Sequence, residues 1–343
     1  MLSGKNHKFF TSCGDAEAEM LLKRVLLEMK ELLSGTDFCV VLGGSYGRGD
    51  GGVRQDRENG LLYNDLDFFV FARKKLCHGE KLLKEIAEKY EKELKVDVDF
   101  SRIMSIKDIK NNVRRLMMQE LKRGYVLVYG EDLPEKFLPE KPAEDLPFSE
   151  ACRLLLNRGM GLLFAGEKIM ENSSDTDFIL RNLYKGILGA VDSVLIAEGN
   201  YRWKIGERLQ YINERPDFPE EWKRLYCEAV SFKHFPHRQG KENMLSFWMR
   251  CRALFLAAIS RCAGGEEELA QQIYSRCCRK GEFSWKNFVK YCIKCRTLPA
   301  GNWKYYFVPP AAVLVKEIYE ALNGQPGKID RNAYLFRSWQ LFN

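Results

Sequence analysis

The hydrophobic pattern of this 343-residue chain changes its period about two-fifths of the way along the sequence. Before residue 130, short apolar runs typical of buried strands alternate with helix-period segments. After residue 148, helix-period segments dominate, at about residues 149–172, 176–198, 219–231, 243–263 and 265–279. The pattern predicts a small mixed sheet with helices in the first part and an all-helical second part, which is an α+β fold.

The strands expected in the first part are short. Residues 38–42 and 66–71 are continuous apolar runs, as expected of strands that are buried on both faces. Residues 96–100 alternate apolar and acidic side chains, and residues 125–129 form a last apolar run. The helix-period segments of this part lie at residues 15–34, 79–95 and 106–123.

A charged, proline-containing segment separates the two parts. Residues 130–147 include four prolines, a composition that resists regular structure and is typical of an interdomain linker. We therefore expect an N-terminal domain over residues 1–147 and a helical accessory or substrate domain over residues 148–343. Ser149 is expected to cap the first helix of the second domain.

The composition is typical of a packed globular protein. Hydrophobic residues make up 45% of the chain and charged residues 29%, which excludes a disordered chain. The longest apolar stretches, residues 154–165 and 244–259, are interrupted by arginines and are shorter than the ~20 residues that span a bilayer. The first residues lack the apolar core of a secretory signal. We expect a cytoplasmic protein without a membrane partner.

Eleven cysteines are scattered through the chain, mostly in helix-period segments. Without a secretory signal, reduced and mostly buried thiols are favoured over a disulfide framework. The closest cluster is Cys277 and Cys278 with Cys292 and Cys295. It lacks the paired C-x-x-C units of a structural zinc site, so positions on a buried helix face are favoured, and metal binding stays open.

Two pairs of aspartates occupy strand positions that could bring carboxylates together. Asp65 and Asp67 open the second predicted strand, and Asp97 and Asp99 lie on the third. Residues two apart on a strand share a face, so each pair projects both carboxylates to one side. A single such pair is more often a solvent-facing edge, but two pairs on otherwise apolar strands weaken that interpretation. The cluster would repel itself without cations, and its oxygen ligands suit Mg²⁺, or Mn²⁺ in its place.

A glycine turn follows the first predicted strand. Gly43 and Gly44 allow close backbone approach, so that N–H groups and the N-terminus of the next helix can hold phosphates, and Ser45 can donate a hydroxyl hydrogen bond. The net charge of +7 also favours anionic ligands such as nucleotide phosphates. These residues predict a triphosphate site beside the aspartates.

The order of strand, Gly-Ser turn, Asp-hydrophobic-Asp strand and later strand carboxylate resembles the DNA polymerase beta-like nucleotidyltransferase superfamily. The match is detailed over residues 36–103, and residues 121–130 are similar to the segment that closes this domain in members with small substrates. The helical second part is similar in kind to the accessory domains of these enzymes. The resemblance implies a polymerase-beta-like N-terminal domain.

The resemblance also implies roles for the residues. Asp65 and Asp67 would be metal ligands, with Asp99 or Asp97 as the third carboxylate, and Gly44 and Ser45 would hold the triphosphate. The implied reaction transfers a nucleoside monophosphate from an NTP, with ATP expected, to an acceptor hydroxyl, and two metal ions assist the release of pyrophosphate. A small molecule or a protein is favoured as acceptor, and an RNA end stays open. The alternative is a non-catalytic nucleotide-binding or partner-binding protein of antitoxin or sensor type.

One departure from the superfamily pattern lies between the turn and the first aspartates. Nineteen residues separate Ser45 from Asp65, more than is usual, and the excess is the glycine-rich stretch of residues 49–60. The insertion could form a lid or an acceptor loop. Arg48, at its start, could reach a phosphate or could belong to a solvated loop, and the sequence favours neither.

Two basic residues and two histidines of the second part are further candidates for contact with a phosphate or a metal. Lys185 lies one helical turn after Arg181 and could reach a bound triphosphate, as basic residues of related accessory domains do, although a solvated helix face is favoured. His234 and His237 could bind a metal or a phosphate, but no carboxylate or cysteine lies at ligand spacing. A surface loop is therefore favoured for the two histidines.

Overall fold

The computed structural model of the chain divides into two compact units. The first unit comprises Met1–Pro142 and Ser231–His237, and the second comprises Ala143–Val230 and Arg238–Asn343. The predicted boundary followed residue 147, a few residues beyond Pro142. The structure describes residues 8–55, 60–74, 79–236, 243–295, 302–324, 327, 329–330 and 333–342.

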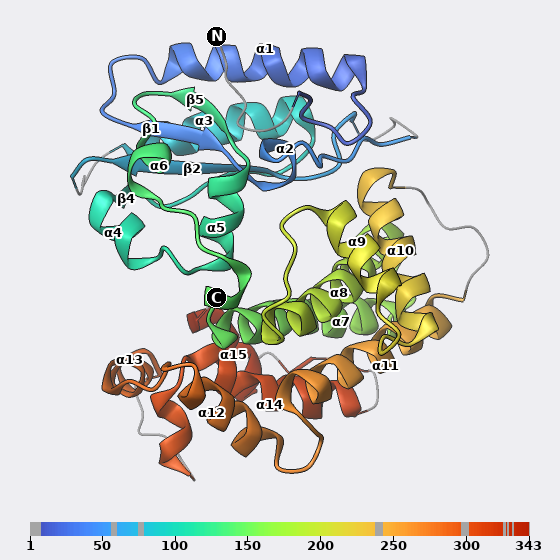
Figure 1. Ribbon diagram of the computed structural model, residues 1–343. Helices are drawn as coiled ribbons and strands as arrows, with labels where there is room; N and C mark the ends of the chain where they lie inside the picture. Colours follow the sequence, from blue (N-terminus) through green and yellow to red (C-terminus); the bar gives the residue numbers. More distant parts are fainter. Residues whose placement is uncertain are drawn as a thin grey trace. The chain divides into compact units, whose positions relative to one another are not determined.

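The fold class is α+β, as predicted (Figure 1). Over the described residues the chain forms 15 α-helices, two short 3₁₀-helices and one mixed sheet of five strands. None of these helices is long and apolar enough to cross a membrane.

The sheet of the first unit runs in the order β3-β2-β1-β5, with β4 also paired to β2. Strand β1 is antiparallel to β2 and β5, whereas β2 is parallel to β3 and β4. The four predicted strands are confirmed to within two residues, and β4 is a two-residue strand that the sequence pattern did not indicate. The bounds are β1 Cys39–Leu42, β2 Leu66–Ala72, β3 Val98–Phe100, β4 Met104–Ser105 and β5 Val126–Tyr129.

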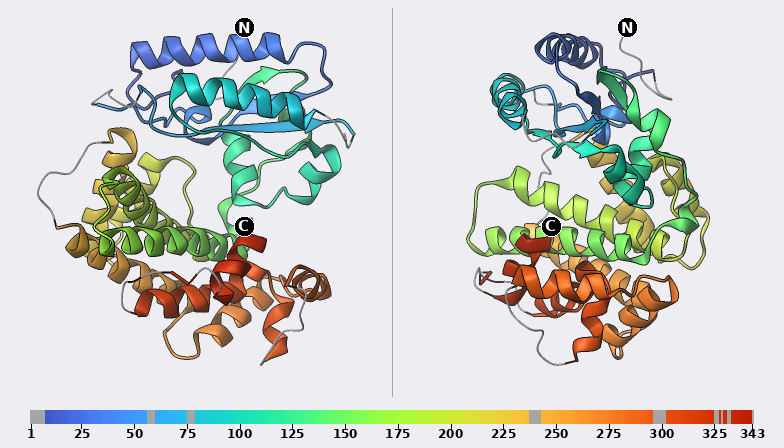
Figure 2. Two further views of the ribbon diagram at one scale, coloured as in Figure 1. Left: turned by 180° about the vertical axis from the view of Figure 1, so that it is seen from behind. Right: turned by 90° about the vertical axis from the view of Figure 1, so that its left-hand side faces the viewer.

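Helices cover both faces of the sheet (Figure 2). One face packs against α1 and α3 through residues such as Val40 and Leu42, and the other packs against α4, α5 and α6 through residues such as Val41. Both faces of β1 are therefore buried, which explains its unbroken apolar run. The helices of this unit are α1 Ala16–Leu32, α2 Gly44–Gly47, α3 Glu80–Leu94, α4 Ile106–Asn111, α5 Leu116–Arg123 and α6 Leu133–Phe137.

The single helix predicted over residues 106–123 is wrong, because the chain forms α4 and α5 with a break between them. The Asn112 side chain donates to the Asp108 carbonyl at 2.7 Å, and the Gln119 side chain donates to the Val113 carbonyl at 2.7 Å. The Gln119 side chain therefore occupies a carbonyl that a continuous helix would bond to its own backbone, whereas the Asp108 carbonyl also keeps its bond from the Asn112 N–H at 3.1 Å. A capping box between Ser105 and Asp108 fixes the start of α4.

The predicted linker over residues 130–147 contains regular structure, which corrects that expectation. Asp132 caps α6 by accepting from the Glu135 N–H at 2.9 Å, and Pro134 lies in the first turn, where a missing N–H costs nothing. The Tyr125 hydroxyl also donates to Asp132. A short 3₁₀-helix, η1 (Ala143–Asp145), follows in the second unit.

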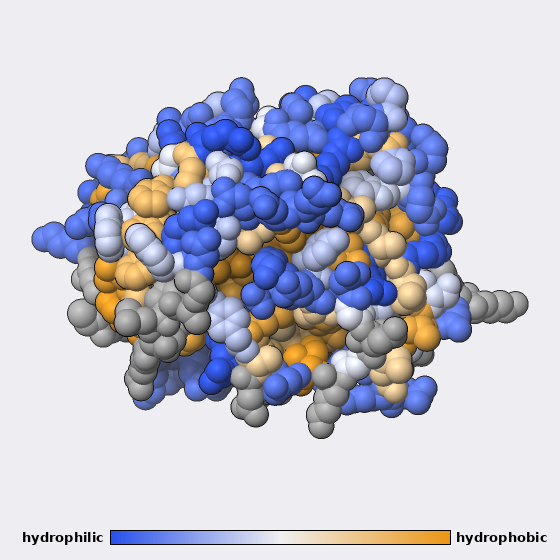
Figure 3. Space-filling model, turned by 90° about the horizontal axis from the view of Figure 1, so that it is seen from below, coloured by the Kyte–Doolittle hydropathy of each residue, from blue (hydrophilic) through white to orange (hydrophobic). Residues whose placement is uncertain are grey.

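The second unit is helical throughout its described residues. Gly186 and Gly189 of α8 allow close approach to α7, since a Cβ at either position would lie within 2.8 Å of an α7 side chain. The face that α12, α13 and α14 present carries hydrophobic side chains among hydrophilic ones (Figure 3). The elements are α7 Phe148–Met170, α8 Thr176–Ala197, α9 Ile205–Glu214, α10 Glu220–His234, α11 Met244–Ala263, α12 Leu269–Arg279, α13 Trp285–Cys295, η2 Trp303–Phe307, α14 Pro310–Asn323 and α15 Tyr334–Phe342.

The predicted cap at Ser149 is wrong. Helix α7 begins after Pro147, and no side chain caps it from the preceding residue. The Ser149 N–H instead donates to the carboxylate of Glu282 at 3.1 Å. A partner 133 residues away in the sequence therefore satisfies the first turn of α7.

Candidate functional site

The glycine turn and the first aspartates meet where β1 ends and β2 begins. Leu42, the last residue of β1, lies opposite Phe68 in the antiparallel register. The Gly43 N–H donates to the Asp67 carbonyl at 2.8 Å, which extends the pairing by one residue. The turn predicted to hold phosphates therefore adjoins one of the predicted metal ligands.

Gly44 lies directly against the Asp67 side chain. A Cβ added at Gly44 would stand 2.0 Å from Oδ2 of Asp67, and the residue has a positive φ of 59°. Both features require glycine at this position. Gly43 is enclosed by hydrophobic side chains, since its Cβ would lie 2.6 Å from the Phe69 ring. Ser45 follows in α2, and its carbonyl accepts from the Asp50 N–H at 2.9 Å.

Asp99 lies beside Asp67 on the neighbouring strand. The two residues are register partners in the parallel pair β2–β3, where the strands are about 4.8 Å apart and paired side chains share a face. Asp65 lies two residues before Asp67, directly ahead of β2, and its charge acts on the Asp99 carboxyl. Asp97 precedes β3, and its carbonyl accepts from the Leu66 N–H at 2.9 Å.

Neighbouring carboxylates act electrostatically on Asp99. Partial burial raises the pKa of the Asp99 carboxyl, and the negative charges of Asp65 and Asp97 raise it further. The Glu91 carboxylate adds a smaller effect of the same sign.

The donor types at this sheet edge suit a hard divalent cation. Asp67 and Asp99 are register partners and Asp65 directly precedes β2, and their carboxylate oxygens are the ligands that Mg²⁺ and Mn²⁺ prefer. Among the described residues, no group of three or more His, Cys, Asp or Glu side chains is already gathered closely enough to hold a metal ion. The oxygen ligands of these aspartates therefore suit a divalent metal ion, although the described side chains are not gathered around a common point.

Tyr46 is a residue of this region that the sequence analysis did not identify. Its side chain is fully buried, and its hydroxyl donates to the Gly52 carbonyl at 2.8 Å. The same hydroxyl accepts from the N–H groups of Tyr63 at 3.0 Å and Asn64 at 3.3 Å. Burial raises the pKa of Tyr46, so the hydroxyl stays protonated. Because Asn64 precedes Asp65, Tyr46 links the glycine turn to the first aspartate.

The described start of the insertion is packed rather than solvated. Residues 51–53 are buried, and the Gly52 N–H donates to the Asn64 side chain at 2.7 Å. The Val53 N–H donates to the His234 carbonyl at 3.4 Å. A solvated loop is therefore excluded for these three residues, whereas residues 56–59 of the insertion lie outside the described chain.

Arg48 and Lys185 lie in different units. The Arg48 guanidinium is half-buried and forms an ion pair with Glu120 of α5 at 3.4 Å, inside the first unit. Lys185 is half-buried on α8 of the second unit, and the neighbouring Arg181 pairs with Asp177 at 3.3 Å. Contact of Arg48 or Lys185 with a phosphate stays a prediction.

The histidine segment differs from the predicted surface loop. His234 is the last residue of α10, and burial lowers the pKa of its imidazole. The His234 carbonyl accepts a hydrogen bond from the Val53 N–H, so the His234 backbone helps to position the insertion. His237 lies outside the described residues.

The cysteine cluster shows no metal site over the described residues. Cys277 is buried and hydrogen-bonds Cys152, whose pKa is raised mainly by burial. Cys278 hydrogen-bonds Tyr274 instead, and the Cys295 side chain lies outside the description. Every cysteine that the structure describes is a free thiol, as expected for a reduced protein.

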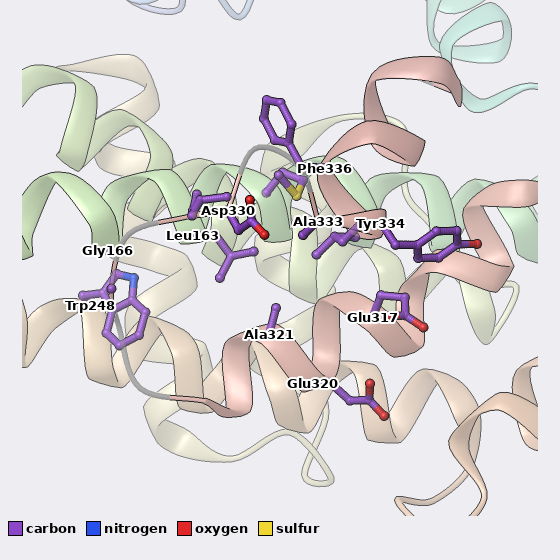
Figure 4. A pocket seen from close by; sticks show the side chains of 14 residues that line it. Leu163, Gly166, Trp248, Glu317, Glu320, Ala321, Asp330, Ala333, Tyr334 and Phe336 are labelled. Carbon is purple, nitrogen blue, oxygen red and sulfur yellow. The ribbon is translucent and has the colours of Figure 1, made fainter. Parts of the chain in front are cut away.

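The second unit contains a cavity of about 360 Å³ between α7, α11, α14 and the start of α15 (Figure 4). Apolar side chains such as Leu163, Trp248 and Phe336 line it, and Glu317 and Glu320 of α14 stand at its wall. Its volume is at the lower end of the range for small-molecule pockets. It is separate from the carboxylate group of the first unit.

No known protein-family model matches the chain, and no curated protein sequence matches it significantly. The residues and geometry of the sheet edge therefore carry the functional argument.

Proposed function

We propose that the first unit transfers a nucleoside monophosphate from an NTP, ATP by expectation, to an acceptor hydroxyl with release of pyrophosphate. The observation that carries the proposal is the contact of Gly44 with the Asp67 carboxylate, with Asp99 in register beside it. A phosphate-binding turn and a pair of carboxylates on neighbouring strands are the two parts that this reaction requires. We also propose that the first unit has the polymerase-beta-like fold.

The turn would bind the triphosphate. Gly44 has no side chain that would keep a phosphate away from the backbone, and Ser45 can donate its hydroxyl. Both residues open α2, and Gly44 directly contacts the Asp67 carboxylate. Arg48 could add a positive charge if its pairing with Glu120 gave way to a phosphate.

Asp65, Asp67 and Asp99 would hold Mg²⁺ or Mn²⁺ together with the triphosphate. When bound, such ions activate an acceptor hydroxyl and stabilise the pyrophosphate that leaves. We favour Asp99 over Asp97 as the third carboxylate, because Asp99 is the register partner of Asp67. Asp99 could also accept the proton of the acceptor hydroxyl, directly or through the bound metal.

The acceptor is proposed to be a small molecule or a protein hydroxyl. The test incubates the protein with cell extract and Mg²⁺, using ATP labelled in parallel at the α-phosphate and at the γ-phosphate. The proposal predicts an acceptor that carries the α-label and not the γ-label. The mass of the labelled acceptor then identifies its class, including an RNA end.

The matched variants are Asp65→Asn with Asp67→Asn, and Asp37→Asn as control. Asp37 is exposed in the same unit and stands just before the opposite end of β1. Labelling should fall at least about a hundredfold in the double variant, since metal ligands contribute several kcal/mol to transition-state stabilisation. Transfer of the γ-label, or equal labelling by the folded double variant, would exclude the proposal. NTP binding without transfer to any acceptor would favour the non-catalytic alternative.

A further inference from the structure

Helix α13 exposes a row of apolar side chains. Trp285, Val289 and Ile293 follow one another at intervals of four residues and are 64%, 49% and 71% exposed. That spacing places them on one side of the helix. The opposite side is used for packing, since Tyr291 is 2% exposed.

The exposed row continues into an aromatic group around Phe307. The ring of Phe307 is buried, and its centroid lies 4.7 Å from that of Trp285, 4.9 Å from that of Phe283 and 5.5 Å from that of Trp303. Phe283 and Trp303 are 48% and 59% exposed. We name the whole the α13 patch, which consists of Phe283, Trp285, Val289, Ile293 and Trp303. It is more contiguous than the scattered apolar side chains of an ordinary surface.

The chain around the α13 patch is strongly basic. Residues 276–304 contain eight lysines and arginines and one acidic residue, a net charge of +7. The whole chain also has a net charge of +7, so the remaining residues sum to zero. The single acid, Glu282, turns its carboxylate to the Ser149 N–H. The positive charge of the protein is therefore concentrated beside the patch.

The lysines of α13 run alongside the apolar row. Lys286, Lys290 and Lys294 each follow a patch residue by one position and have the same spacing of four. They form a second row, about 100° further round the helix. Both rows lie on the exposed side of the helix, as all three lysines are exposed.

We propose that the α13 patch attaches the protein to the surface of an anionic membrane. Tryptophans at the water–lipid boundary, with aliphatic side chains inserted and lysines at the level of the acidic headgroups, form the arrangement that binds such a surface. Val289 and Ile293 argue against single-stranded RNA, because aliphatic side chains offer no ring on which a base can stack. The proposed attachment is peripheral. The sequence-based expectation of no membrane partner rested on the lack of a membrane-spanning stretch and differs from this proposal.

The test is sedimentation of the full chain with vesicles of phosphatidylcholine, alone or with about a third phosphatidylserine. We expect binding to the anionic vesicles that is at least about tenfold tighter than to the neutral ones and that weakens as salt is raised. Absence of binding to anionic vesicles would overturn the proposal. So would retention of single-stranded RNA in preference to the vesicles.

Two variants separate the contributions of the rows. Trp285→Ser with Ile293→Ser should reduce vesicle binding at least about tenfold at every salt concentration, because the inserted area is lost. Lys286→Gln with Lys290→Gln should abolish the preference for phosphatidylserine. Lys81→Gln with Lys84→Gln is the control, since both lysines are highly exposed on α3.

Further measurements distinguish loss of membrane binding from other effects of the substitutions. Each variant is compared with the unaltered protein by thermal unfolding, so that loss of folding is recognised. Vesicle binding by the serine variant equal to that of the parent would refute the proposal. The parent protein could instead self-associate as its concentration rises, lose this association in the serine variant and fail to bind vesicles. That outcome would assign the patch to contact with a second copy of the chain and overturn the proposal. Transfer of the α-label should be unchanged in all three variants, so failure here is distinct from failure of the proposed function.

Discussion

At the scale of residues, the candidate site rests on the contact of Gly44 with the Asp67 carboxylate and on the register that places Asp99 beside Asp67. The paired spacing of Asp65 with Asp67 identifies both from the pattern alone, because a strand has a fixed period. The contact of Gly44 with Asp67 depends on the antiparallel register of β1 and β2, which no local pattern encodes. The preference for Asp99 over Asp97 likewise comes from a strand pairing.

Replacement of Gly44 by alanine tests the contact with Asp67. We expect Gly44→Ala to destabilise the protein by about 1–2 kcal/mol, because a side chain at positive φ is strained. The added methyl group would also displace the Asp67 carboxylate, so NMP transfer should fall further than stability does. Urea unfolding and the labelling assay measure the two effects. Gly206→Ala on α9, with no atom within 4 Å of its Cβ, should be neutral or stabilising, and equal losses in both variants would contradict the account.

The raised pKa of Asp99 gives a prediction about pH. A carboxyl whose pKa is higher in the folded than in the unfolded state destabilises the fold when ionised, and this cost disappears as the pH falls below the ordinary value of 3.8. Without metal, Asp99→Asn should therefore be slightly more stable than the parent at pH 7, by less than about 1 kcal/mol for a largely solvated group. The difference should vanish near pH 3. Thermal unfolding in EDTA at both pH values measures it, and a less stable variant at pH 7 would contradict the assigned repulsion.

At the scale of elements, strands and helices with a strong hydrophobic period were predictable from the sequence. Helix ends that depend on hydrogen bonds to distant residues were not. The strands and the long helices α7, α8 and α11 agree with their predicted ranges to within a few residues. The break between α4 and α5 depends on side chains such as Gln119, which also donates to Pro139. The start of α7 depends on Glu282, which lies 133 residues further along the chain. Such partners are brought together by the fold, so a local window of sequence does not contain them.

Tyr46 tests how α2 supports the site. In Tyr46→Phe the buried Tyr63 N–H and Gly52 carbonyl, and the part-buried Asn64 N–H, lose their shared partner, which should cost about 1–3 kcal/mol. Transfer should also slow, because Asn64 directly precedes Asp65. The control is Tyr129→Phe, whose hydroxyl contacts Gly35 and Thr36 at the protein surface and should contribute less than about 1 kcal/mol. Urea unfolding and labelling rates compare the two, and equal behaviour would refute a positioning role for Tyr46.

At the scale of the whole molecule, the two units are not continuous in sequence. Residues 231–237 belong to the first unit, although they follow the helices of the second. Phe232 is buried against the Tyr63 ring with centroids 5.7 Å apart, and Lys233 pairs with Asp50 at 3.8 Å. Helix α10 continues into this segment as far as His234, so the sequence pattern gives no local signal of the return.

Truncation of Phe232 tests the return segment. Phe232→Ala should cost about 3–5 kcal/mol, as expected for a buried aromatic side chain. Hydrogen exchange at residues 51–53 and 61–63 should accelerate, because the segment holds this part of the insertion. Phe235→Ala, at a ring that is 41% exposed, should change stability by no more than about 0.5 kcal/mol. Unaltered exchange in Phe232→Ala would show that the insertion is held by other contacts.

The most direct test of the central claim is a titration of the protein with Mn²⁺, followed by electron paramagnetic resonance, with and without a non-hydrolysable ATP analogue. We expect Mn²⁺ binding that the analogue strengthens and that Mg²⁺ displaces. The Asp65→Asn, Asp67→Asn variant should lose this binding, and Asp37→Asn should keep it. Equal Mn²⁺ binding by the folded double variant, or no binding by the parent protein in the presence of the analogue, would contradict the assignment of this sheet edge as a metal–nucleotide site.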